Sequence, residues 1–244
     1  MWSIYRKEIS SFLNSLIAYL VMTVFLVTMG LLVWVFPDTG IFEYGYADLG
    51  IFFNMVPFVF MFLIPAITMK SIAEESKSGM LELLFTKPIN EIKLVFGKYL
   101  AGLTLVLVTL LPTIIYYFSL RYISNPVGNV DTAGIIGAYI GLLFLASSYT
   151  AIGVFSSSLS ENQIVAFIIA LFFSFLLFMG FSSISSLTIF EGMSTSLDQL
   201  GMQYHYDALG KGVIDIRDVI YFISVTFIFI YATFWVLKLK KWNS

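Results

Sequence analysis

The sequence contains no cysteine, one histidine and few charged residues. Without cysteine the chain forms neither disulfides nor thiolate metal sites, and its redox compartment cannot be read from the sequence. Charged residues make up only 11% of the 244 residues, whereas an ordinary soluble domain has about 25%. The net charge of −2 also rules out the basic surface of a nucleic-acid-binding domain. The chain is therefore neither a disulfide-stabilised secreted domain nor a nucleic-acid-binding protein.

Sequence motifs that would mark an enzyme are absent as well. There is no G-x-x-x-x-G-K-[ST] phosphate loop, so the chain does not bind and split ATP by that route. H-E-x-x-H and G-x-S-x-G are also missing, and a metal site would have to rest on carboxylates alone. We therefore expect a chain with no catalytic site, cofactor or metal of its own, whose energy for any transport comes from a partner.

Apolar side chains are abundant instead. They make up 59% of the residues, and the mean hydropathy is +0.92. A soluble fold of this size could not bury so much apolar surface. The apolar runs are long and continuous, whereas the strands of a membrane barrel are short and alternate in polarity. The composition therefore predicts an all-α integral membrane protein.

Six apolar runs lie between charged residues, and each is long enough to cross about 30 Å of hydrocarbon as a helix. We read the whole chain, residues 1–244, as one transmembrane domain with six transmembrane helices. Because six is even, both termini are expected on the same side of the membrane. The spans are predicted at residues 15–36, 49–69, 99–120, 133–156, 163–184 and 219–237.

The distribution of Lys and Arg predicts which side is cytoplasmic. Ten of these residues lie in the N-terminal segment, the 70–98 segment and the C-terminal tail, and the other three lie on the opposite side, which accounts for all 13. Basic residues concentrate in the short cytoplasmic loops of membrane proteins. The sequence therefore predicts a multi-pass protein of the cell inner (cytoplasmic) membrane with both termini in the cytoplasm.

Residues 1–14 have the pattern of an interfacial amphipathic helix. Apolar side chains recur at spacings of three and four on one face, and polar side chains occupy the other. Such a helix lies in the headgroup region of the bilayer. The alternative is a helix that extends the first span, which Arg6 and Glu8 disfavour. The apolar face comprises Trp2, Tyr5, Ile9, Phe12, Leu13 and Leu16.

The cytoplasmic segment between the second and third spans, residues 71–90, combines dense charge with a short apolar stretch. Five of the six residues 80–85 are apolar. Ser78 is placed to cap a helix beginning there, and Lys87 with Pro88 to end it. Because a two-turn helix of this composition must bury its apolar side chains, it docks either on another protein or in lipid headgroups. We favour docking on a protein.

Small residues and prolines mark positions inside the spans. Ala133, Gly137 and Gly141 recur every four residues, and such a small-residue face lets two helices approach closely. We expect this packing within the chain, with a seam between two copies as the alternative. Prolines in the second and third spans predict kinks, which are either static or hinges for opening. They are Pro57, Pro65 and Pro112.

Two polar segments remain. The external segment, residues 185–217, is predicted to form short helices before the last span, and its His205 is interpreted as an interfacial hydrogen-bonding residue, with substrate contact and metal binding as alternatives. Residues 156–163 are expected to form a solvated cytoplasmic turn, or else a second partner contact. The residues considered for an external gate or substrate contact are His205, Tyr206, Lys211 and Gly212.

The cytoplasmic segment carries a family resemblance. Its residues Glu75, Gly79, Glu82, Leu83, Leu84, Pro88 and Gly97–Lys98 resemble the cytoplasmic loop of ABC-2-type transporter permeases. Residues 205–222 are similar to the stretch before the last span in that family, and more narrowly the chain resembles permeases associated with gliding motility, the GldF type.

The resemblance implies a coupling helix that sits on a separate cytoplasmic ABC ATPase, which would hold ATP and Mg. It also implies a second permease copy or a homologous membrane subunit. The residues expected to contact the ATPase are Glu74, Glu75, Gly79, Met80, Glu82, Leu83, Leu84 and Pro88.

Together these features predict the membrane-spanning permease subunit of an ATP-driven ABC-2-type transporter of the gliding-motility type, which serves export or movement across the inner membrane. One alternative is a non-transporting scaffold that anchors a cytoplasmic machine. Another is a secondary transporter, which the uncharged spans disfavour because ion-coupled transporters keep ionisable groups at mid-membrane.

Overall fold

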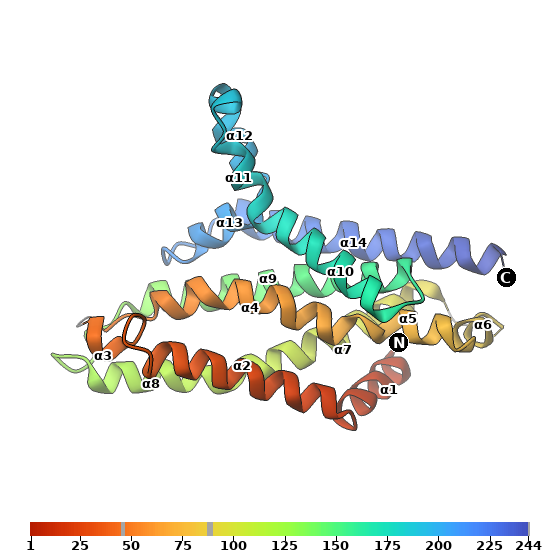
Figure 1. Ribbon diagram of the computed structural model, residues 1–244, viewed down its shortest axis with the longest axis horizontal. Helices are drawn as coiled ribbons and strands as arrows, with labels where there is room; N and C mark the ends of the chain where they lie inside the picture. Colours follow the sequence, from red (N-terminus) through yellow and green to blue (C-terminus); the bar gives the residue numbers. More distant parts are fainter. Residues whose placement is uncertain (45–46, 87–89, 244) are drawn as a thin grey trace.

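The structure is a computed structural model that describes residues 1–44, 47–86 and 90–243. These residues form a bundle of long helices and contain no β-strand, which confirms the predicted all-α class for the described part of the chain. The N-terminus, the C-terminus and α6 lie at one end of the bundle, while α3 lies at the other (Figure 1). The helices are α1 (Trp2–Leu13), α2 (Leu16–Trp34), α3 (Ile41–Tyr44), α4 (Gly50–Thr68), α5 (Lys70–Lys77), α6 (Met80–Phe85), α7 (Glu91–Leu110), α8 (Ile114–Ile123), α9 (Thr132–Leu159), α10 (Gln163–Phe175), α11 (Phe181–Ser185), α12 (Ser194–Asp198), α13 (Met202–Leu209) and α14 (Ile216–Asn243).

Five helical segments of the described residues are long and apolar enough to cross a membrane. A sixth candidate is the pair α1 and α2, which is bent by 66°. Four of the spans predicted from the sequence fall inside these segments, while span 15–36 ends two residues beyond α2 and span 49–69 begins one residue before α4. The five continuous segments are Gly50–Lys77, Glu91–Ile123, Thr132–Leu159, Gln163–Ser185 and Ile216–Trp242.

Several helices continue beyond the predicted spans. The second span runs through α4 directly into α5, so the beginning of the segment 71–90 continues this helix. The third span is interrupted where Pro112 lacks a backbone donor, and the chain forms a 3₁₀ turn over Leu111–Thr113 between α7 and α8. Pro57 and Pro65 stay within the α-helical run of α4.

The long helix α9 occupies the centre of the bundle. It packs against α4, α5, α7, α10, α13 and α14, and most of its length is buried. Small side chains permit this close packing. A Cβ atom at Gly137 would collide with the backbone carbonyl oxygen of Leu209, and one at Gly141 would lie 3.1 Å from the Tyr206 ring. The small-residue face therefore lies against α13 and the turn after it, inside this chain.

The first half of the polar stretch 156–163 is helical rather than a solvated turn, and the turn is confined to residues 160–162. α9 extends to Leu159, and Ser156, Ser157 and Ser158 are buried. The Ser157 hydroxyl accepts hydrogen bonds from the backbone N–H groups of Ile72 and Ala73, both at 3.0 Å. It also donates to the carbonyl oxygen of Met69 at 2.8 Å. The serines therefore hold α5 against α9 and are not a surface loop.

The residues after α10 form an arm that leaves the bundle. α10 passes through a π-helical turn, Leu176–Gly180, into α11. The arm continues through a 3₁₀ helix, Thr188–Met193, and α12. Figure 1 shows α11 and α12 standing away from the bundle, whereas α13 returns to it. Short helices were predicted for this segment, but α11 and α12 do not pack on the main bundle as α13 does.

Candidate functional sites at the two ends of the bundle

Charge separates the two ends of the bundle. We call the end that carries α1, α5, α6 and the last turns of α14 the terminal end, and the end that carries α3 and α13 the distal end (Figure 1). The predicted basic segments all belong to the terminal end. Several of their lysines are paired there, as in the contact of 2.6 Å between Lys241 and Glu91. Each end holds one candidate site.

A buried lysine forms the centre of the terminal end. Lys98 lies in α7, and its side chain is only 1% exposed. Its Nζ atom is 3.0 Å from Oε1 of Glu8 in α1 and 2.8 Å from Oε2 of Glu75 in α5. It also donates to the backbone carbonyl oxygen of Ser71 at 2.5 Å. A single ammonium group thus connects three helices.

Glu75 completes this buried group. Its Oε1 atom accepts from Nζ of Lys7 at 2.9 Å, so both carboxylate oxygens face lysines of the same chain. Glu75 is only 8% exposed. Its carboxylate is thus buried and paired internally in this chain, and its role as an ATPase contact stays a prediction. Glu74 is exposed.

The short helix α6 follows α5 through Gly79, whose φ angle of 72° lies in the left-handed region. Ser78 does not cap α6 as expected, because it ends α5 and its hydroxyl donates to the carbonyl oxygen of Glu75 at 3.3 Å. Leu81 is buried, while Leu83 is 66% and Met80 44% exposed.

The remaining predicted contacts are distributed around α6. Leu84 is half-buried and packs with the cluster that includes Leu81, whereas Glu82 is exposed on the outer face. Lys87 and Pro88, which were expected to end the helix, lie outside the described residues. The exposed apolar surface of α6 is therefore narrower than the sequence predicted, since it rests on Met80 and Leu83.

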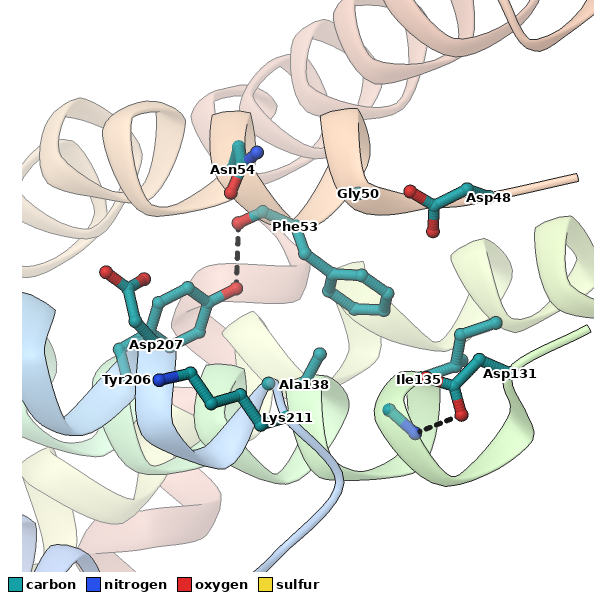
Figure 2. A pocket seen from close by; sticks show the side chains of 12 residues that line it. Asp48, Gly50, Phe53, Asn54, Asp131, Ile135, Ala138, Tyr206, Asp207 and Lys211 are labelled. Carbon is teal, nitrogen blue, oxygen red and sulfur yellow. Dashed lines mark hydrogen bonds between the residues drawn. The ribbon is translucent and has the colours of Figure 1, made fainter. Parts of the chain in front are cut away.

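The distal end contains a pocket of about 360 Å³ between α4, α9 and α13. Figure 2 shows acidic side chains around it, with Tyr206 between α13 and α4. The Tyr206 hydroxyl donates to the carbonyl oxygen of Phe53 at 2.8 Å, and Oδ1 of Asp131 accepts from the N–H of Gly134 at 3.0 Å. The polar and charged lining residues are Asp48, Asn54, Asp131, Tyr206, Asp207 and Lys211.

Comparison with protein families decides the class of this molecule. A family model described as an ABC-2 family transporter protein matches residues 38–203, more than half of the chain. The chain belongs to the ABC-2 transporter family. It is thus a multi-pass membrane protein of a transport family whose membrane subunits generally have no catalytic site. Among curated proteins, no significant match is found.

The family match covers much of both candidate sites. In this ABC-2 chain it includes α5, α6, Lys98 and the part of the distal pocket formed by α4 and α9. α1 and α14 lie outside the matched residues. The buried contact between Glu8 and Lys98 therefore joins a helix outside the match to one inside it.

Of the four residues considered for an external gate or substrate contact, two line the distal pocket and two lie outside it. Tyr206 and Lys211 line the distal pocket. His205 does not, because Nδ1 lies 2.6 Å from Oδ1 of Asp218 and Nε2 lies 2.9 Å from the carbonyl oxygen of Gln199. Its buried ring therefore fastens α13 to α14, in agreement with a hydrogen-bonding role. Gly212, with φ of 79°, packs against the backbone of α9.

Burial changes the protonation behaviour of two residues in the distal pocket. Desolvation raises the pKa of the Asp207 carboxyl above its ordinary value; the charge of Lys211 opposes this shift and that of Asp198 adds to it. Desolvation also raises the pKa of the Tyr206 hydroxyl, so this group remains a hydrogen-bond donor throughout the physiological range. In this pocket the charge of Lys211 does not fully offset the effect of burial on the Asp207 carboxyl, and the neighbouring Tyr206 hydroxyl is neutral.

Sequence reasoning missed the buried group at the terminal end. Lys98 was considered only as part of the family resemblance, and Glu8 only as a charge that disfavours an extension of the first span. One signal was present: Glu8 lies three residues after Tyr5 and four before Phe12, so a helix places it at the edge of the apolar face. A carboxylate at such a position needs a partner when the face is buried.

Proposed function

We propose that this chain is the membrane-spanning permease subunit of an ATP-driven transporter, and that α6 is the coupling helix that docks on a separate ABC ATPase. The observation that supports the proposal is the apolar outer face of α6, where Leu83 and Met80 are exposed at the terminal end. This end carries most of the basic residues, which favours a cytoplasmic position.

The energetics favour a partner with an apolar groove and charged edges. Full burial of a Leu or Met side chain contributes about 1.5–3 kcal/mol. Two such side chains do not by themselves offset the cost of association. The exposed charges of Glu74, Lys77 and Glu82 surround them and would fix the register of α6 in the groove.

The partner would supply the chemistry that this chain lacks. The ATPase would hold ATP and Mg, while this chain binds no cofactor itself. A second permease copy or a homologous membrane subunit would complete the transport path, and ATP hydrolysis would drive export or movement across the inner membrane. The proposed context is gliding motility, and it rests on the sequence resemblance alone.

The test is co-purification of the ATPase from native membranes, with ABC ATPase identified by mass spectrometry through its phosphate-loop sequence. Leu83→Glu places a charge against an apolar wall, and the desolvation of an unpaired charge costs several kcal/mol. We expect the wild-type chain to recover the ATPase and Leu83→Glu to lose it at equal abundance in the membrane.

Leu200→Glu is the matched control, because Leu200 is also an exposed leucine but lies in the external segment. This variant should recover the ATPase as well as the wild type does. Equal recovery by Leu83→Glu and Leu200→Glu would refute docking through α6. Recovery of the ATPase without any ATP-dependent transport would favour the scaffold alternative.

A further inference from the structure

We infer that Lys98 is a positioning residue that makes α1, α5 and α7 one mechanical unit, so that movement of the coupling segment is passed to the N-terminal helix and the third span. The inference rests on the proposed docking of α6. Glu75, Glu8 and Lys7 belong to the same unit, which we call the lysine joint. None of these four side chains needs to touch the ATPase.

Three oxygen atoms surround the ammonium group of Lys98. It donates hydrogen bonds to Oε1 of Glu8 at 3.0 Å and to the Ser71 carbonyl oxygen at 2.5 Å, and it forms an ion pair with Oε2 of Glu75 at 2.8 Å. One of these oxygens comes from α1 and two come from α5, while the lysine itself comes from α7. The ammonium group therefore connects α7 to both of the other helices.

The charges of the joint are paired across the three helices, because Lys98 of α7 contacts glutamates of both α1 and α5. Two lysines face two glutamates, and Lys98 is almost fully buried. Removing one partner from a buried pair leaves an uncompensated charge, which is strongly destabilising. Separation of α1 or α5 from α7 at this point would therefore leave a charge without a partner, and the three helices are expected to move together.

The joint lies next to the coupling helix in the chain. Glu75 is four residues before Gly79, where α5 gives way to α6, so a displacement of α6 reaches the joint through little more than one helical turn. α1 is also packed tightly on α7 beside Lys98. A Cβ atom at Gly97 would lie 2.9 Å from Cγ2 of Ile4, and the Tyr5 hydroxyl lies 3.1 Å from Oγ1 of Thr104.

The test measures movement of α1 in the assembled complex. Because the native chain has no cysteine, Ser11→Cys in α1 and Ile164→Cys in α10 provide two specific sites for spin labels. Both positions are exposed. The distance distribution between the labels is recorded by pulsed electron paramagnetic resonance in the complex with the ATPase, with and without a non-hydrolysable ATP analogue.

We expect the distance to shift on nucleotide binding in the wild-type background and the shift to be lost in Lys98→Met, at unchanged recovery of the ATPase. Lys98→Arg keeps the charge and should restore the shift. Lys93→Met is the matched control, because Lys93 is an exposed lysine of the same helix. A shift in Lys98→Met equal to that in Lys93→Met would overturn the inference.

Two further outcomes are separable. If Lys98→Met does not reach wild-type abundance, a triple variant provides the same test. It combines Glu8→Gln, Glu75→Gln and Lys98→Met, so that no glutamate of the joint keeps a charge without a partner. We again expect the distance shift to be lost, and a shift equal to that in Lys93→Met would overturn the inference. If the wild-type chain recovers no ATPase, the proposed function fails, and the inference fails with it. Loss of the shift with intact ATPase recovery is the result that a merely structural role would not produce.

Discussion

At the scale of single residues, the packing of the helices depends both on a glycine that has no side chain and on a lysine whose long side chain is buried. Gly137 has no Cβ, and the space that a Cβ would occupy is taken by the backbone after α13. Lys98 shows the opposite case, since its long side chain fills an interior position and depends on two glutamates from other helices. In both cases the requirement comes from residues far away in the sequence.

Gly137→Leu should therefore prevent the close approach of α9 to the turn that follows α13. Overpacking of a well-packed site typically costs about 1–3 kcal/mol, and a backbone carbonyl has less freedom to yield than a side chain. We expect a clear loss of folded chain, measured as the monodisperse fraction after detergent extraction. Gly192→Leu is the control, because a Cβ there meets no atom within 4 Å. Equal yields of the two variants would contradict the packing.

At the scale of elements, α5 and α6 behave as two rigid pieces joined by Gly79. α5 is held by the lysine joint on one side and by Ser157 of α9 on the other. α6 presents Leu83 outwards and buries Leu81. The direction of α6 therefore depends on the backbone conformation of Gly79, whose positive φ is rarely adopted by other residues.

Gly79→Val should weaken docking for a conformational reason. No atom lies within 4 Å of an added Cβ, so steric crowding is not the reason. A β-branched residue at positive φ is strained, and a left-handed conformation costs roughly 1–2 kcal/mol. We expect reduced ATPase recovery at normal membrane abundance. Gly79→Asn, which tolerates this conformation better, should retain more recovery, and the opposite order would disprove the explanation.

The elements themselves were largely predictable, whereas their ends were not. The six spans could be predicted from the lengths of the apolar runs and from the charges that flank them, because a helix must have a minimum length to cross the bilayer. The extension of α9 through Ser156–Ser158 was missed, since polar residues at the end of a span look like a loop until the carbonyl oxygen of Met69 is placed beside them.

The candidate sites were predicted less completely than the elements. The apolar stretch of α6 was visible in the sequence because it is local. The contacts of Lys98 are not local, since its carboxylate partners lie 90 residues and 23 residues earlier in the chain. No spacing rule connects such positions. Only the fold brings them together, through the packing of α1 on α7 and of α5 on α9, which also packs against α7.

At the scale of the whole molecule, the chain is electrically asymmetric along its long axis. Both termini and the lysine-rich segments lie at the terminal end, while the distal pocket is lined by Asp48, Asp131 and Asp207 (Figures 1 and 2). An even number of crossings fits this arrangement. The positive-inside rule predicts that the terminal end faces the cytoplasm.

Cysteine labelling tests this orientation without interference from native thiols. Lys77→Cys, at the end of α5, should react with a membrane-impermeant maleimide only after the cells are opened. Val127→Cys, in the exposed connection between α8 and α9, should react in intact cells. The cysteine-free native chain provides the background. Labelling of Lys77→Cys in intact cells would reverse the orientation and would also remove α6 from the reach of a cytoplasmic ATPase.

The π-helical turn at Leu176–Gly180 has a consequence for length variation in this part of the chain. A π turn accommodates one residue more than an α turn, and each residue of an α-helix turns the chain by about 100°. Deleting one residue from this turn would restore a regular helix and rotate everything beyond it by that angle. The direction in which α11 and α12 leave the bundle thus depends on a single-residue insertion, so homologous chains with and without it would point the same arm to different sides.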